Sequence, residues 1–210
     1  MRVIRASFPL ALAVAGLAVA AGPAMAAPPC ARPDTITLQK NRHVRVFETR
    51  AGAARDYERV LRACNRHTGH TVRLARAFDD GYVTSATYGR VRLAGRFVAW
   101  SSSYTDVSCK AACPPGYEST TFAAHVRDIR LTKSRHAALD SRATALVLTR
   151  LGAIAWTTGS GGTVELSALD SAGRRVLDTG PIDPKSVTAA AESVRWTRDG
   201  EPRSQALGSY

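Results

Sequence analysis

Short stretches of alternating apolar and polar residues, separated by turn residues, run through most of the sequence. The clearest one lies within Arg150–Thr158, where Ile154 and Trp156 would point to one side of a strand and Ala153 and Ala155 to the other. A period of two residues is typical of a β-strand and unlike that of a helix. Polar turns that contain glycine separate these stretches. The pattern therefore predicts an all-β protein made of short antiparallel strands.

The stretch around Trp156 has three further copies in the chain. Trp100 lies at the matching position of GRFVAWSS, Trp196 at that of AESVRWTR, and Val46 replaces tryptophan in the weaker copy NRHVRVFE. Units of about 40 to 50 residues with four short strands are the period of β-propeller blades. We therefore expect stacked four-stranded antiparallel units whose shared core contains Val46, Trp100, Trp156 and Trp196. An ordinary β-sandwich with three tryptophans in its core is the alternative.

The turns set the expected limits of these units. Residues 78–90 are polar and are expected to form a loop that carries a weak strand, and a long insertion interrupts the second unit. Because Pro-rich segments are typically extended, residues 27–34 are predicted to be a leader to a single domain of residues 35–210. Within that domain we expect units at residues 35–78, 91–140, 145–180 and 187–207.

Two motifs of the third unit carry a family resemblance. Gly152–Trp156 (GAIAW) has the form G-x-[VI]-A-W, and Asp170–Arg174 (DSAGR) has the form D-x-x-G-R. These motifs resemble the blades of secreted β-propeller proteins of the TolB-like and WD-repeat kind, over about residues 35–207. The resemblance implies a propeller-like fold and brings no catalytic residues with it. A closed propeller ring has roughly four to eight blades. This sequence has fewer complete units than that. The array would therefore be completed by the strand at Thr35, stay open, or close through a second chain.

The first 26 residues have the three parts of a secretory signal peptide. Arg2 and Arg5 precede an apolar run from Phe8 to Ala21, and Ala24–Ala26 forms an A-x-A cleavage site. The apolar run is shorter than the roughly 20 residues that a transmembrane helix needs. We therefore expect a mature chain that begins at Ala27, is secreted or lies in the cell envelope, and has no transmembrane segment.

The four cysteines fit an oxidising compartment. Cys109 and Cys113 lie in a Ser/Pro/Gly-rich stretch that suits a local disulfide, which would leave Cys30 with Cys64. Four cysteines can pair in three ways, so the pairing stays open. The spacing C-x3-C beside isolated histidines does not supply the ligand pairs of a zinc site. We expect structural disulfides and no metal.

The formal net charge of the whole chain is +12. A basic protein outside the cell can adhere to anionic polymers. The arginines are spread evenly, however, and no dense basic run stands out, which favours a solvated basic surface over a dedicated polyanion site. We expect no specific binding of nucleic acid.

Three stretches have residues that could carry chemistry, but each is better explained as a turn. Thr158–Gly162 resembles a serine-nucleophile loop, yet no histidine has the flanking motif of a known triad, and a glycine hairpin explains the stretch. His67 and His70 lack a third metal ligand. Asp79 and Asp80 lack the other oxygen ligands of a calcium loop. We therefore expect no catalytic residue and no cofactor.

These observations predict an exported, non-catalytic binding or scaffold protein whose partner is a cell-envelope polymer or another exported protein. Long insertions of repeat proteins usually mark the binding face. The expected contact residues lie on the insertion that starts at Ser102, and they are Tyr104, Asp106, Lys110 and Tyr117. One alternative is a hydrolase or lyase of an extracellular polymer, with Asp and Glu side chains gathered on one face. The other is adhesion to the envelope through net charge.

Overall fold

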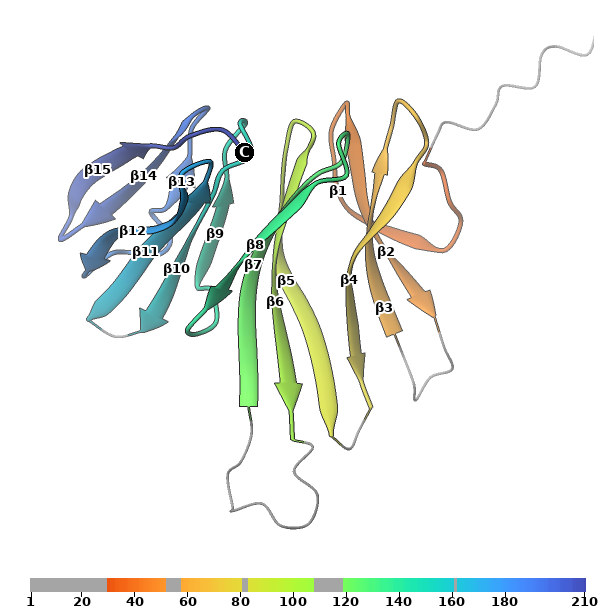
Figure 1. Cartoon of the computed structure of the whole chain (residues 1–210), viewed down its shortest axis with the longest axis horizontal. Coiled ribbons are helices and arrows are strands. Elements are labelled where there is room, and N and C mark those ends of the chain that lie inside the picture. Colours follow the sequence, from red (N-terminus) through yellow and green to blue (C-terminus); the bar gives the residue numbers. More distant parts are fainter. Residues whose placement is uncertain (1–29, 52–57, 81–82, 108–118, 161) are drawn as a thin grey trace, which may run out of the picture.

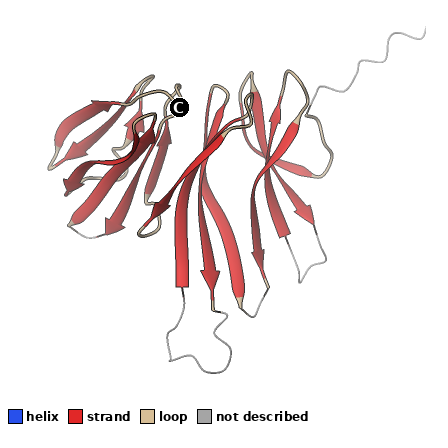
Figure 2. Cartoon of the chain, in the orientation of Figure 1, coloured by secondary structure: helices blue, strands red, loops and turns tan. Residues whose placement is uncertain are grey.

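A computed structural model describes residues 30–51, 58–80, 83–107, 119–160 and 162–210. The expected signal peptide, residues 27–29 of the leader, Cys109, Cys113, Lys110 and Tyr117 lie outside the described residues. Strands and connecting turns make up the part of the chain that is described, and no helix occurs there (Figure 2). The prediction of an all-β protein is confirmed. No helix in the described ranges is long and apolar enough to cross a membrane.

The strands follow one another in chain order as antiparallel meanders, which we group into four units (Figure 1). Unit 1 contains β1 (Thr35–Lys40), β2 (Val44–Ala51), β3 (Glu58–Asn65) and β4 (Thr71–Asp79). Unit 2 contains β5 (Thr84–Ala94), β6 (Phe97–Asp106), β7 (Ser119–Asp128) and β8 (Ser134–Leu139). Unit 3 contains β9 (Ala145–Leu148), β10 (Ile154–Ser160), β11 (Thr163–Asp170) and β12 (Gly173–Gly180). Unit 4 contains β13 (Thr188–Ala189), β14 (Ser193–Arg198) and β15 (Glu201–Ala206).

Units 1 and 2 belong to one eight-stranded sheet, but they meet over a short contact. β4 and β5 pair only through Phe78 with Ala86 and Asp79 with Ser85. Within units 1 and 2, neighbouring strands pair over longer stretches. The sheet therefore consists of two four-stranded halves that are joined by one short pairing and share an apolar core. None of the described sheets closes into a barrel.

Three apolar cores lie between successive units. The core between units 1 and 2 includes Val46 and Trp100, and that between units 2 and 3 includes Trp156. Trp196 lies in the core between units 3 and 4. All four side chains are buried. The three tryptophans pack against the unit that precedes their own. Val46 instead packs against the following unit, and its neighbour Phe47 lies on the outer face of unit 1.

The first strands of the units lie next to one another. Gln39 of β1 donates from Nε2 to the backbone oxygen of Val91 on β5 at 2.9 Å. Arg92 of β5 donates from Nε to the backbone oxygen of Leu146 on β9 at 3.0 Å. The units thus stack with their first strands side by side, and their hairpin turns gather at common ends.

The segment at 78–90 differs from the expectation of a loop. β5 begins at Thr84 and pairs with β6 along most of its length. Its side chains are partly exposed and polar, so apolar alternation does not mark it. Cross-strand bonds such as that between the Thr87 and Ser103 hydroxyls, at 2.8 Å, hold it instead.

At the N-terminal end of the described chain, Cys30 and Cys64 form a disulfide that covers Phe47 on the outer face of unit 1.

Candidate functional site: a cationic cleft at the turn end

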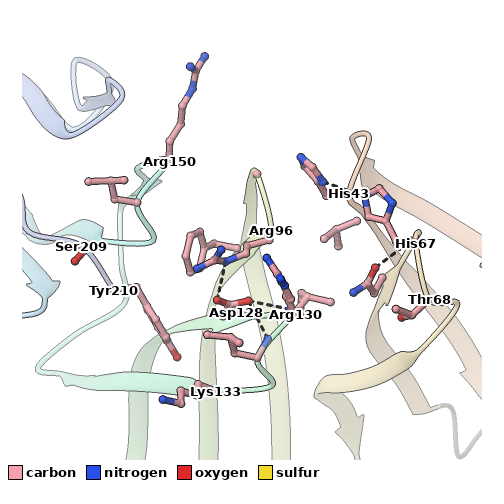
Figure 3. A pocket seen from close by; sticks show the side chains of 17 residues that line it. His43, His67, Thr68, Arg96, Asp128, Arg130, Lys133, Arg150, Ser209 and Tyr210 are labelled. Carbon is pink, nitrogen blue, oxygen red and sulfur yellow. Dashed lines mark hydrogen bonds and ion pairs between the residues drawn. The ribbon is translucent and has the colours of Figure 1, made fainter.

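A cleft of about 870 Å³ opens where the hairpin turns of units 1, 2 and 3 converge (Figure 3). Its walls come from the β1–β2, β3–β4, β5–β6, β7–β8 and β9–β10 turns and from Ser209 and Tyr210. In an antiparallel meander every second turn lies at the same end of the sheet. Stacking three such sheets therefore brings together turns that are far apart in sequence.

The buried carboxylate of Asp128, at the end of β7, organises the centre of the cleft. It accepts hydrogen bonds from Arg96 Nε at 2.7 Å, from the backbone N–H of Arg130 at 2.8 Å and from that of Leu131 at 3.1 Å. Asx side chains often cap a turn in this way. Asp128 thus fixes the β7–β8 turn and neutralises Arg96.

The same position of two other units carries the same kind of turn cap. Asn65 ends β3 and accepts from the backbone N–H of His67 at 3.0 Å, and Asp170 ends β11 and accepts from that of Ala172 at 2.9 Å. In units 1, 2 and 3 an Asn or Asp at the end of the third strand therefore shapes the turn that follows.

Three cations of the cleft have no carboxylate partner among the described residues. Arg130 and Lys133 lie on the β7–β8 turn and Arg150 on the β9–β10 turn, and all three are exposed. In Figure 3 Arg130 lies beside Asp128, whereas Arg150 extends outward from the rim. With Arg96 paired to Asp128, the lining keeps an excess of positive charge. A concave basic surface of this kind attracts anions.

A pair of histidines forms the unit 1 side of the cleft. His43 Nδ1 lies 3.2 Å from His67 Nε2, and His43 Nε2 accepts from Arg42 Nε at 2.8 Å. Partial burial lowers the pKa of His43, and charge on Arg42 and His67 lowers it further. The sequence suggested His67 and His70 as a possible pair, whereas in the structure His67 lies next to His43. No group of three or more His, Cys, Asp or Glu suited to a metal occurs in the described ranges.

Apolar side chains form the floor between the cations. Leu131 is 51% exposed although it is large and apolar. Leu151 and Tyr210 are partly buried and are joined by a hydrogen bond from the backbone N–H of Tyr210 to the oxygen of Leu151, at 2.8 Å. The Tyr210 ring packs against Phe97 with centroids 5.4 Å apart. The cleft therefore offers apolar surface beside exposed cations.

The predicted contact loop lies at the other end of unit 2. Tyr104 and Asp106 are near the end of β6, away from the β5–β6 turn that lines the cleft (Figure 1). The other two predicted contact residues, Lys110 and Tyr117, lie outside the described residues. The assignment of this loop to a contact surface stays a prediction, and the structure adds a separate candidate at the turn end.

The acidic residues with shifted pKa values all pair with arginines. Hydrogen bonds from Arg175 lower the pKa of Asp170 to about 2, with burial acting against them. Burial raises the pKa of Asp178, but bonds from Trp196 and Arg198 outweigh it and leave that pKa below its ordinary value. A general acid for glycoside hydrolysis needs a raised pKa instead. These carboxylates therefore serve as structural ion pairs.

The other stretches that suggested chemistry form turns. Gly159 has φ +92° at the end of β10, next to the β10–β11 hairpin. The carboxylate of Asp80 accepts from the backbone N–H groups of Val83 and Thr84, both at 2.9 Å. Both features fit the expected turn role.

A serine–histidine contact was missed by sequence reasoning. Ser102 Oγ lies 2.8 Å from His125 Nε2, and the imidazole stacks on Trp100 with centroids 4.9 Å apart. Burial, with a smaller contribution from His136, lowers the pKa of His125 to about 4. No described carboxylate hydrogen-bonds to this imidazole. The contact therefore lacks the orienting group of a triad.

No family model matches the chain, and no curated protein matches it in sequence. Among solved structures, one from a mechanistic study of two prolyl endopeptidases is similar, with a TM-score of 0.46 and 12% identity. The alignment covers 82% of this chain and 29% of the solved one. This chain thus spans less than a third of the length of the structure that it matches.

Proposed function

We propose that the protein is an exported, non-catalytic binding module whose turn-end cleft holds an anionic ligand. The observation that carries the proposal is the set of three exposed cations, Arg130, Lys133 and Arg150, which line the same cleft without a described carboxylate partner. The signal-like N-terminus and the disulfide between Cys30 and Cys64 support export.

The fold we propose for this module is an open, propeller-like array. The support is the adjacency of the first strands of successive units, which lie side by side as the innermost strands of propeller blades do. Such an array places all turns of one kind on one face, and ligand sites on rigid scaffolds are commonly built from such turns. The cleft has a volume in the range of small-molecule sites, about 300 to 1,000 Å³.

The test compares two triple variants that remove the same charge. The cleft variant is Arg130→Gln/Lys133→Gln/Arg150→Gln, and the control is Arg73→Gln/Lys185→Gln/Arg195→Gln, whose three side chains are exposed and do not line the cleft. Binding of pyrophosphate and of citrate is measured by titration calorimetry. We expect the cleft variant to bind about tenfold more weakly and the control to change less than about twofold.

Two results would count against the proposal. Equal losses in both variants would mean that net charge alone attracts the anion, which is the envelope-adhesion alternative. Failure of the unmodified protein to bind pyrophosphate, citrate and the amphipathic anion anilinonaphthalene sulfonate at millimolar concentration would remove the cleft as an anion site.

A further inference from the structure

We infer that the ligand of the cleft is an amphipathic organic anion, whose charged group meets the cations and whose aliphatic or aromatic body lies on Leu131, Leu151 and Tyr210. This inference rests on the proposed function and adds the chemical class of the ligand. It follows from the apolar floor, which an anion site alone does not require.

Leu131 is held in its exposed position by the fold. Its backbone N–H donates to the buried Asp128 carboxylate, and Thr132, which follows it, has φ +57°. A positive φ is strained for a threonine and persists only where the surroundings fix it. The turn thus presents a large apolar side chain on the same cleft-lining segment as two cations, Arg130 and Lys133. Burying such a side chain against a ligand is favourable by the apolar area removed from water.

The opposite wall of the cleft is apolar as well. Tyr210 is tied to Leu151 through its backbone, packs on Phe97 and has Arg135 above its ring, with the guanidinium carbon 5.9 Å from the centroid. The segment before it is fastened by the hydrogen bond from Gly208 N–H to Asp170 Oδ2, at 2.7 Å. The backbone of Tyr210 is therefore held by unit 3 and its ring by Phe97 and Arg135 of unit 2, and Tyr210 lines the same cleft as Leu131.

The dimensions and charge layout favour an organic anion over a bare inorganic one. An inorganic anion is typically held by several donors converging on one point, whereas the unpaired cations here belong to two turns and stand at the rim. The cleft of about 870 Å³ is much larger than such an ion. A ligand with one charged end and an apolar body would contact the cations at the rim and also fill the volume of the cleft.

Three probes distinguish recognition of the charged group of the ligand from recognition of its apolar body. Anilinonaphthalene sulfonate has a fused aromatic body and a sulfonate, N-phenylnaphthylamine has the same rings without the sulfonate, and sodium sulfate supplies the anion alone. Binding is followed by probe fluorescence in the unmodified protein, in Leu131→Ser and in the two triple variants above. Val176→Ser is the matched apolar control, because Val176 is 53% exposed and lies on β12, outside the cleft.

We expect Leu131→Ser to weaken anilinonaphthalene sulfonate binding about fivefold and Val176→Ser to change it less than about twofold. The cleft triple variant should weaken the sulfonate probe about tenfold while N-phenylnaphthylamine changes less than about twofold. Sulfate should displace the sulfonate probe from the unmodified protein. Circular dichroism and a cooperative thermal transition verify that each variant is folded, since loosely packed states also bind this dye; Leu131→Gln replaces Leu131→Ser if the latter is not.

The outcomes distinguish the two proposals. If the cleft triple variant weakens the sulfonate probe but Leu131→Ser does not, the anion site stands and the amphipathic class is wrong. If neither variant weakens it, both the inference and the anion-binding cleft are wrong. If the unmodified protein does not bind the sulfonate probe, the inference is wrong, and the anion-binding cleft is wrong as well when pyrophosphate and citrate also fail to bind. Equal effects of Val176→Ser and Leu131→Ser would overturn the inference as well.

Discussion

At the scale of single residues, buried polar side chains determine how this fold responds to pH, and His125 is the clearest case. It lies between Trp100 and His136 and bonds to Ser102 while its pKa is lowered to about 4 from an ordinary value of 6.5. The unfolded chain therefore takes up a proton near pH 6.5, whereas the folded chain does so only near pH 4. Stability should fall as the pH drops through this window.

The expected loss from this residue between pH 7.5 and pH 5 is about 2 kcal/mol. The measurement is urea unfolding at both pH values for the unmodified protein and for His125→Gln, which can keep the bond to Ser102. The variant should lose less stability than the unmodified protein by roughly that amount. An identical loss in both proteins would mean that His125 titrates normally.

At the scale of elements, the residue that ends the third strand of a unit can tie its sheet to other segments of the chain. In unit 3 Asp170 does this for the segment at Gly208. Its carboxylate takes two bonds from Arg175, at 2.6 and 2.8 Å, and one from Gly208 N–H, and it is almost fully buried. Asp140 pairs with Arg174 at 3.4 Å but is 86% exposed. Both pairs join an aspartate to an arginine, but Asp170 is buried and Asp140 is exposed.

We expect Asp170→Asn to cost about 3 kcal/mol of unfolding free energy, because it leaves Arg175 without its buried partner. Asp140→Asn should cost less than about 0.5 kcal/mol, since exposed pairs contribute little. Denaturant unfolding near neutral pH measures both. Equal costs would show that the buried pair is no more important than the exposed one. Below about pH 4 the difference should shrink, because the low pKa of Asp170 gives stability that protonation removes.

Strands could be predicted from the sequence where apolar alternation was strong, as around Trp156. The pattern could not place the start of β5, because Thr84–Tyr88 is polar and is held by its partner strand rather than by a core. It could not place the cleft either. Asp128 ends a strand as Asp170 does, so its turn role was visible in principle. The contact of His43 with His67 depends on which turns of one sheet lie at the same end, and the presence of Leu131 and Tyr210 in one cleft depends on how units stack. No local period encodes either.

At the scale of the whole molecule, the two end faces of the stack decide whether it can close through a second copy. The outer face of unit 1 carries Phe47 under the disulfide, Arg45 above the Phe47 ring, and the cross-strand pair of Arg62 and Arg73. The outer face of unit 4 carries polar side chains with the exposed Arg195 among them. Neither face offers the apolar core of a stable interface.

Joining the two end faces would also bring like charges together, so we predict that the chain is a monomer with an open array. Like-charge contacts oppose association, and the opposition weakens as salt screens it. Sedimentation velocity at low and high salt should give a monomer in both. Arg62→Glu/Arg73→Glu reverses the charge of the unit 1 face and should be the variant most inclined to self-associate, with high salt dissolving that association. A dimer of the unmodified chain that persists at all salt concentrations would show instead that the end faces are complementary. The cleft would then belong to a closed ring of two chains rather than to an open array.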